Sequence, residues 1–269
     1  MNERTPQRAR AIRIIAVLLV LIAAELAVLV YLLLSNRQQP AADQTAPAET
    51  AVVPTPTAEP TVDLAPTADM GQEYIDRIVF LGDSTTYGLG FYDVVPFTQV
   101  WTPASGTMAL GNWAVETIDY RDPASPETSE SLSIVDCAAR RKPEVLVITL
   151  GINGIAFLDE AGFKQYYTDL INAVLAASPD TKIICHSLYP VMDSKAPGGI
   201  DNARVNAANG WVRDVAAATG TRYLNSHDLL MDGTGNLNAA YNNGDDMGIH
   251  LNPDGFAVVM QNLRTHAYQ

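Results

Sequence analysis

Three short runs of the sequence hold a hydroxyl, an amide and an imidazole in settings where they could act together. Ser84 ends the run Gly-Asp-Ser after the apolar residues IVFL, Asn153 follows the apolar run VLVIT, and His250 stands just before Asn-Pro-Asp. A serine hydroxyl becomes a nucleophile when an imidazole takes its proton and a third group orients the ring. An amide donor can stabilise the oxyanion that then develops. Each run alone also fits an ordinary turn, so the chemistry depends on the fold bringing them together.

The pattern of apolar runs predicts how the three residues are positioned. Runs typical of buried strands occupy residues 78–81, 145–150, 182–186 and 222–224. Helical patterns occupy residues 131–141, 161–177, 202–218 and 252–266, the last opening with an Asn cap and a first-turn proline. Alternating strands and helices predict an α/β fold with a mostly parallel sheet covered on both faces. The carboxyl ends of its strands share one edge, where such folds bind ligands.

The stretch between Tyr87 and Asp119 is less regular. Short extended pieces are expected at residues 97–101, 108–110 and 114–118, and one of them should supply the second strand of the sheet. The pattern leaves open which piece does so.

Taken together, the motifs resemble the SGNH/GDSL hydrolase family. GDS at 82–84, GIN at 151–153 and IHLNPDG at 249–255 match its first, third and fifth blocks, in the family's order and at similar spacing. The resemblance runs from Ile78 to the C-terminus. It implies a three-layer α/β/α sandwich with a flavodoxin-like five-stranded sheet, and serine ester hydrolysis that needs neither metal nor cofactor.

The same resemblance assigns roles to individual residues. Ser84 would attack the ester carbonyl while His250 takes the serine proton. The backbone N–H of Ser84 and the side chain of Asn153 would hold the oxyanion. A glycine N–H from the family's second block would complete this oxyanion hole, and we expect it at Gly106, with Gly111 as the alternative.

The sequence departs from the family at the acid of the triad. The family places an aspartate three residues before the histidine, and here that position is Met247. Asp246 lies four residues before His250 and Asp245 five, so the loop must bulge for either carboxylate to reach the ring. We expect Asp246 to make the contact. A backbone carbonyl that orients the imidazole, leaving a Ser-His dyad, is the alternative.

The N-terminal part of the chain has the composition of a membrane anchor and a stalk. Residues 14–34 are apolar except for Glu25 and, as a helix, would be about 30 Å long, the thickness of a hydrocarbon core. Four arginines precede this segment, so the positive-inside rule places residues 1–13 in the cytoplasm. Residues 35–71 are rich in Pro, Ala and Thr and predict a disordered linker, followed by a hydrolase-like domain at 72–269. The predicted location is therefore the cell membrane, with the folded domain outside.

Composition limits the partners. The chain has 17 Lys+Arg against 30 Asp+Glu, a formal net charge of −13, and no basic stripe, which argues against nucleic acid as a partner. Cys137 and Cys185 are expected to be buried free thiols, with one disulfide as the alternative. His186 and His227 are expected to be structural, and Trp101 and Tyr87 to form either a substrate platform or core packing.

The resulting expectation is an extracytoplasmic serine esterase. Its substrate would be a small acyl ester or an acylated glycan, with acetyl esters on cell-wall glycans favoured by the predicted location. An O-acyltransferase using the same Ser-His site is the first alternative. A non-catalytic surface binding module, favoured by the displaced aspartate, is the second.

Overall fold

A five-stranded, wholly parallel sheet forms the centre of the molecule in the computed structural model, which describes residues 61–269. The strand order is β2-β1-β5-β6-β7. The bounds are β1 Ile78–Gly82, β2 Val100–Trp101, β5 Val145–Thr149, β6 Lys182–His186 and β7 Arg222–Leu224. This is the flavodoxin-like order that the family resemblance implies. The predicted cytoplasmic tail, the membrane anchor at 14–34 and the linker as far as residue 60 lie outside the described residues.

The two central strands bring the ends of the sequence motifs to one place. Every residue of β1 and β5 is buried, as the continuous apolar runs predict. The strands pair in register from Ile78 opposite Val145 to Gly82 opposite Thr149. The segments after Gly82 and Thr149 therefore leave the sheet side by side, at its carboxyl edge.

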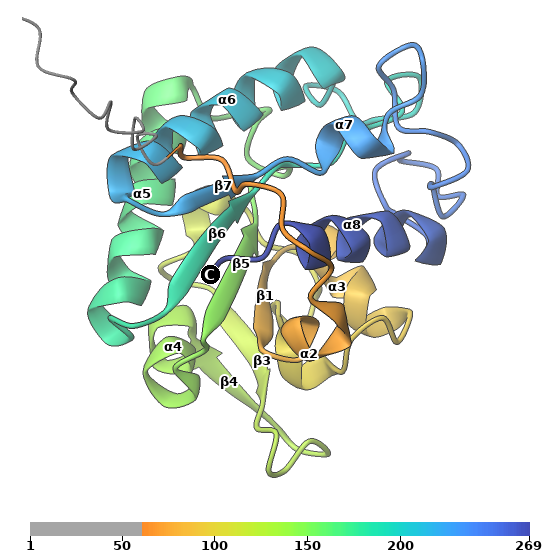
Figure 1. The fold of residues 1–269 in the computed structure, drawn as a ribbon. Helices are drawn as coiled ribbons and strands as arrows, with labels where there is room; N and C mark the ends of the chain where they lie inside the picture. The colour runs from red at the N-terminus through yellow and green to blue at the C-terminus, as the bar shows by residue number, and fades with distance from the viewer. Residues whose placement is uncertain (1–60) are drawn as a thin grey trace, which may run out of the picture. The chain divides into compact units, whose positions relative to one another are not determined.

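Helices cover both faces of this sheet (Figure 1). One face packs on α4 (Ile134–Arg141), α5 (Glu160–Ala177) and α6 (Asn202–Thr219). The other packs on α2 (Gly71–Ile75), α3 (Ser84–Phe91), α7 (His227–Leu230) and α8 (Pro253–Thr265). Alternate residues of each strand join the two cores, as the two-residue period of a strand requires. Val79 and Leu81 face the α5 side, whereas Ile78 and Phe80 face the α8 side.

The second strand of the sheet lies at the end of the extended piece expected at residues 97–101. Residues 97–99 form a 3-10 turn, η1 (Phe97–Gln99), and only Val100 and Trp101 pair with β1. A second 3-10 turn, η2 (Leu110–Asn112), follows. A separate antiparallel hairpin then joins β3 (Thr117–Arg121) to β4 (Ser129–Ser133).

The hairpin corrects the expected start of one helix. Residues 131–133, predicted as helical, belong to β4, and α4 begins only at Ile134. Ser133 ends the strand and caps the helix, because its Oγ accepts a hydrogen bond from the N–H of Asp136 at 3.0 Å. The other three predicted helices are present with ends that differ by one residue.

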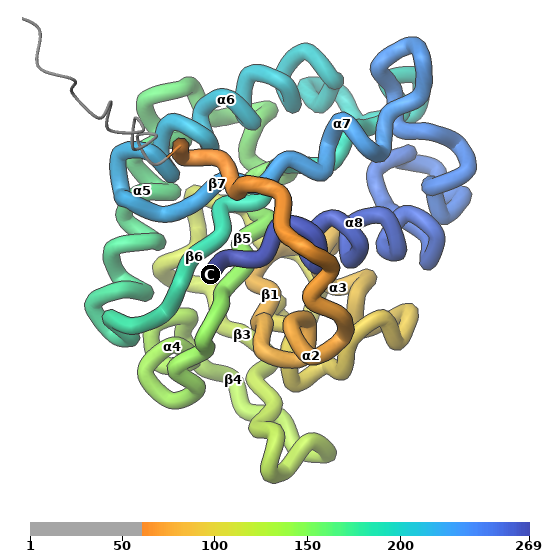
Figure 2. The backbone as a smooth tube through the Cα atoms, viewed as in Figure 1, coloured from red at the N-terminus to blue at the C-terminus, as the bar shows by residue number. Residues whose placement is uncertain are grey.

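The folded part starts earlier than the predicted boundary at residue 72. Figure 2 shows the chain after residue 60 passing along β7 before it reaches α2. Asp63 bridges to Tyr223 of β7, and the Asp63 carboxylate pairs with Arg213 of α6 at 2.6 Å. Asp69 pairs in the same way with Arg264 of α8. Residues 61–71 are thus part of the domain. The backbone of residues 62–64 hydrogen-bonds to the outer edge of β7, and Thr67 and Met70 donate to carbonyls at the end of α8.

Neither cysteine forms a disulfide, as the sequence predicts. Cys137 and Cys185 are free, buried thiols, and burial raises the pKa of each to about 12. Within residues 61–269, no helix combines the length and apolar character needed to cross a membrane.

Candidate active site

Ser84 is the first residue of α3, directly after the central strand β1. The turn between them is tight because Gly82 has no side chain: a Cβ there would lie 2.1 Å from Thr86 Oγ1 and 2.3 Å from the carbonyl oxygen of Thr149. Asp83 caps the helix, and its Oδ1 accepts hydrogen bonds from the N–H and the hydroxyl of Thr85. Ser84 is thus held at a helix N-terminus, where the backbone dipole favours negative charge.

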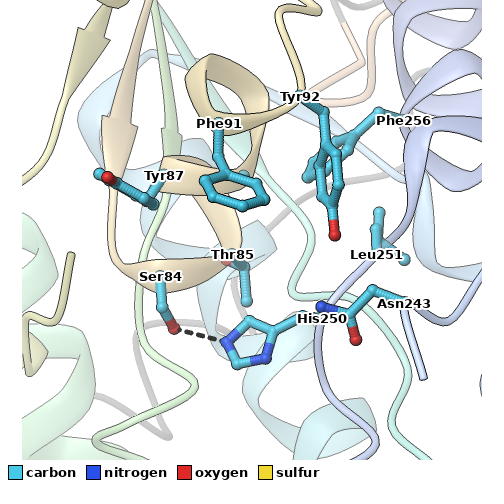
Figure 3. Close-up of a pocket in the computed structure, with 10 residues that line it drawn as sticks. Ser84, Thr85, Tyr87, Phe91, Tyr92, Asn243, His250, Leu251 and Phe256 are labelled. Carbon is cyan, nitrogen blue, oxygen red and sulfur yellow. Dashed lines mark hydrogen bonds between the residues drawn. The ribbon is translucent and has the colours of Figure 1, made fainter. Parts of the chain in front are cut away.

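His250 reaches Ser84 from the other end of the domain. Its Nε2 lies 2.9 Å from Ser84 Oγ, although 166 positions separate the two residues (Figure 3). The histidine stands two residues before the cap of α8, where Asn252 Oδ1 accepts from the N–H of Gly255 and Pro253 begins the helix. The cap fixes the start of α8, and this start sets the position of the imidazole.

The acid beside His250 is Asp245, not Asp246 as the sequence analysis expected. Asp245 Oδ2 hydrogen-bonds His250 Nδ1, whereas the Asp246 side chain is exposed to solvent. The reason is the shape of the loop. Asp245 Oδ1 accepts from the N–H of Gly248 at 2.7 Å, and Gly248 has a positive φ of 63°. Asp246 and Met247 lie on the solvent-exposed side of this turn. The chain then returns toward Ser84 at His250.

The Asp245 carboxylate is held by several donors. Its partial burial would by itself raise its pKa, but hydrogen bonds from His250, from Asn242 Nδ2 at 3.2 Å and from the Gly248 N–H outweigh burial. The net pKa of Asp245 therefore lies below its ordinary value. An ionised carboxylate on Nδ1 requires the tautomer with a proton on that nitrogen, which leaves Nε2 as an acceptor for the serine hydroxyl.

Asn153 lies at the same edge of the sheet, in the turn after β5. This turn depends on Gly151, whose positive φ and whose contact with the Phe163 ring exclude a side chain. Asn153 is partly buried, and its Nδ2 donates to the carbonyl of Met108 at 3.1 Å. A primary amide has two N–H donors, so the second one remains for a ligand.

Gly106 does not present its N–H for an oxyanion in this arrangement. Its N–H donates to the carbonyl of Pro103 at 2.8 Å and closes a turn, and its φ is +71°. The expected third donor of the oxyanion hole is therefore engaged elsewhere. The alternative, Gly111, lies within the η2 turn beside Tyr166.

Asp83 is a buried acid that the sequence analysis treated only as part of the GDS motif. Its side chain is 0% exposed, and Oδ2 has no hydrogen-bond partner among the described residues. Burial raises the pKa of Asp83 to about 6, and the hydrogen bonds from Thr85 reduce this effect without cancelling it. A largely protonated carboxyl group thus lies directly before Ser84 at mildly acidic pH.

The histidines at the end of β6 and the start of α7 are structural, as expected. His186 is fully buried between the hydroxyls of Thr149 (3.0 Å) and Ser226 (2.7 Å), and burial lowers the pKa of His186 to about 3. His227 is also buried, with Nδ1 3.0 Å from Asp228 Oδ1. Neither lines the cavity beside Ser84.

That cavity has a volume of about 240 Å³ and lies between α3 and the start of α8. Ser84 and His250 form one side of it, and three aromatic rings, those of Phe91, Tyr92 and Phe256, form the opposite side (Figure 3). Leu251, Thr85, Gly88, Asn243 and Tyr87 complete the lining. Trp101, a candidate for a substrate platform, is 1% exposed and belongs to the core instead.

The arrangement is suited to acyl transfer. A hydroxyl, an imidazole and a carboxylate form one hydrogen-bonded chain, and amide donors stand at the same edge of the sheet. Within residues 61–269, the acidic, histidine and cysteine side chains do not form a group of three or more that could hold a metal ion.

Comparison with known proteins agrees with this fold. A GDSL-like lipase from Bacteroides thetaiotaomicron has a TM-score of 0.51 with 15% identity, covering 73% of this chain and 89% of that one. A candidate acylhydrolase from Bacteroides fragilis has a TM-score of 0.50 with 15% identity, covering 72% and 91%. At such low identity these structures are similar in fold alone. No curated protein matches the chain.

Sequence similarity identifies a family, which the structural similarity alone does not. Residues 80–258 match the GDSL-like Lipase/Acylhydrolase family, and this range includes Ser84, Asn153, Asp245 and His250. The match extends over more than half of the chain. We conclude that the chain belongs to the GDSL-like lipase/acylhydrolase family.

Proposed function

We propose that the protein is an ester hydrolase that uses Ser84 as its nucleophile and forms an acyl-serine intermediate. The observation that carries this proposal is the hydrogen-bonded chain from Ser84 Oγ through His250 to the Asp245 carboxylate. In this chain the acid holds the tautomer, the imidazole takes the proton and the hydroxyl attacks.

The proton balance follows from the two ring nitrogens. When Ser84 Oγ attacks the carbonyl carbon, its proton moves to His250 Nε2 and the carbonyl π electrons move to the oxygen. Collapse of this intermediate breaks the bond to the alcohol oxygen, which takes the proton from Nε2. A water molecule then repeats the same steps on the acyl-serine, releases the acid and restores the Ser84 hydroxyl.

The proposed oxyanion hole has two donors. The N–H of Ser84 belongs to the first turn of α3 and has no partner within its own helix, while Asp83 caps the next N–H, that of Thr85. The second N–H of the Asn153 side-chain amide is the other donor. Loss of one such donor typically lowers the rate by about 10²- to 10³-fold.

We also propose that the enzyme acts outside the cell while tethered to its membrane. The support is sequence-based: the apolar segment at 14–34, the arginines before it and the Pro/Ala/Thr-rich stretch after it. A catalytic domain on such a tether would reach acylated surface glycans, which we propose as the source of the alcohol part of the ester. The formal net charge of −13 argues against nucleic acid as a partner, because the two would repel each other.

The experiment compares three forms of the full chain: wild type, Ser84→Ala and Ser194→Ala. Ser194 is an exposed serine outside the site and serves as the matched control. We expect Ser84→Ala to lower the turnover of p-nitrophenyl acetate by about 10⁴-fold or more. A fluorophosphonate probe should label wild type and the control at Ser84, located by peptide mass spectrometry. Turnover that persists in Ser84→Ala, or an adduct on another residue, would exclude this mechanism.

A further inference from the structure

The cavity beside Ser84 is built from apolar groups. The Phe91 and Tyr92 rings pack edge to face with centroids 4.9 Å apart, and the Phe256 ring lies 6.2 Å from that of Tyr92. In Figure 3 the Phe91 and Tyr92 rings point toward His250, whereas Tyr87 points to the other side of α3. Leu251 extends the apolar wall on the α8 side.

The position of Gly88 helps to shape this cavity. A Cβ at residue 88 would lie 2.7 Å from the Phe256 ring, so any side chain there would displace the ring. The absence of a side chain in the middle of α3 lets Phe256 of α8 pack directly on the helix that carries the nucleophile. The two helices thus border the apolar space between them.

Most of the lining surface is apolar, and two of its polar groups are already hydrogen-bonded within the protein. The Thr85 hydroxyl donates to Asp83 Oδ1 at 2.8 Å, and Asn243 Oδ1 accepts from the N–H of Asp245 at 2.9 Å. The Tyr92 hydroxyl is directed toward Leu251 and Asn243 (Figure 3). A ligand group with several hydroxyls would lose hydrogen bonds to water here and regain few of them.

We infer that this space between α3 and α8, the acyl cavity, binds the acyl chain of the substrate and selects chains longer than acetyl. The inference rests on the proposed function, since it takes Ser84 as the atom that receives the acyl group. It replaces the acetyl group expected from the sequence with a longer, apolar one.

The acyl part fits this cavity better than the alcohol part of a glycan ester. A sugar alcohol carries several hydroxyls, so it needs several polar partners. The surface of the cavity is mainly apolar, and its volume of about 240 Å³ is smaller than the roughly 300–1,000 Å³ typical of sites for larger ligands. A hydrocarbon chain needs only apolar contact.

Size argues for a chain longer than acetyl. An acetyl group places a single methyl beyond the carbonyl and would leave most of the aromatic wall without contact. The wall continues outward to Phe91, which is 62% exposed, so a longer chain would cover apolar surface that now faces water. Each added methylene that becomes buried should raise kcat/KM by about three- to fourfold.

The test measures kcat/KM of the full chain with p-nitrophenyl esters of acetate, butyrate and hexanoate, which share one leaving group. For wild type we expect kcat/KM to rise along this series. Phe91→Ala removes part of the wall and should lower the hexanoate-to-acetate ratio by about three- to tenfold. Phe157→Ala is the matched control, because Phe157 is 88% exposed and lies outside the cavity; its ratio should equal that of wild type.

A second series of acetate esters with alcohols of increasing length separates acyl from alcohol binding. A length preference that appears in this series and depends on Phe91 would show that the cavity holds the alcohol and would overturn the inference. A flat acyl series, or equal effects of Phe91→Ala and Phe157→Ala, would also overturn it while Ser84-dependent hydrolysis remained. Failure of the proposed function has a different signature, because turnover would then persist in Ser84→Ala.

Discussion

The imidazole of His250 bridges the Ser84 hydroxyl and the Asp245 carboxylate, with Nε2 2.9 Å from Ser84 Oγ and Nδ1 hydrogen-bonded to Asp245 Oδ2. The serine comes from the start of α3, and the other two residues come from the loop before α8. Nothing local in the sequence joins the two segments. They meet because the parallel sheet places its carboxyl ends at one edge and α8 packs beside α3 on the same face.

The first prediction concerns the acid of this triad. Asp245→Asn should lower kcat/KM by about 10²- to 10⁴-fold, because an amide no longer requires the His250 tautomer that can accept the serine proton. Asp246→Asn removes the same charge one residue away, at an exposed side chain, and should leave kcat/KM close to that of wild type. The measurement is steady-state hydrolysis of a p-nitrophenyl ester by both variants. Equal losses in the two would contradict the assignment.

The sequence could not distinguish these two aspartates. Their separation from His250 differs by one residue, and the distinction depends on the left-handed backbone of Gly248 and on the hydrogen bond from its N–H to Asp245. These are properties of a folded loop. Ser84 and His250, by contrast, follow from short motifs next to predicted elements. Ser84 comes just after the strand predicted at residues 78–81, and His250 comes just before the helix predicted from Asn252.

The fold was predictable where apolar runs are continuous. β1, β5, β6 and β7 lie within a residue of the predicted positions, because buried strands of a parallel sheet need unbroken apolar sequence. Helix α3 was not predicted. Its sequence STTYGLGF contains two glycines and two threonines, which disfavour a helix, and tertiary packing on Phe256 and Phe97 overrides that preference.

The acyl cavity also could not be predicted from the sequence. Phe91 and Tyr92 stand 165 and 164 positions before Phe256 in the printed sequence, and no pattern relates them. Only the packing of α8 against α3 brings the three rings to one side of the space beside Ser84.

A second prediction concerns the buried acid Asp83. Its pKa is raised to about 6 in the folded protein and is near 3.8 when unfolded, so between these values the folded state holds a proton that the unfolded state has lost. The stabilisation that this proton gives the folded state is fully present below about pH 4. It declines as pH rises to 6, and the free energy of unfolding falls by about 3 kcal/mol in total. His186 acts in the opposite direction, because its pKa is lowered and its contribution declines as pH falls below about 6.5.

Asp83→Asn isolates the carboxyl group. Asparagine can still cap α3 through its side-chain oxygen, and it does not titrate. The difference in unfolding free energy between wild type and Asp83→Asn should therefore shift in favour of the variant as pH rises from 4 to 6.5. Urea unfolding of both proteins across this range measures the difference. A pH-independent difference would show that Asp83 does not hold its proton in the folded state.

A third prediction concerns His186. His186→Leu leaves the buried hydroxyls of Thr149 and Ser226 without their ring partner, and should lower the free energy of unfolding by about 1–3 kcal/mol or more. Because His186 does not line the acyl cavity, KM for a p-nitrophenyl ester should stay as in wild type. Thermal unfolding at pH 7, together with steady-state kinetics, checks both parts. A raised KM with unchanged stability would instead place His186 in contact with substrate.

The last prediction concerns the turn that holds Ser84. Gly82→Ala would place a methyl group 2.3 Å from the carbonyl oxygen of Thr149, a backbone atom of β5 that cannot move without disturbing the sheet. We expect a loss of more than about 3 kcal/mol in unfolding free energy. Gly210→Ala is the matched control, since Gly210 is exposed in α6 with open space around it, and this change should stabilise the protein by about 0.5–1 kcal/mol. Denaturant unfolding gives the change in unfolding free energy for each variant, and so compares the effect of one added methyl group at the two positions. If Gly82→Ala unfolds like wild type, then the close approach of β1 to β5 is not what holds Ser84 in position.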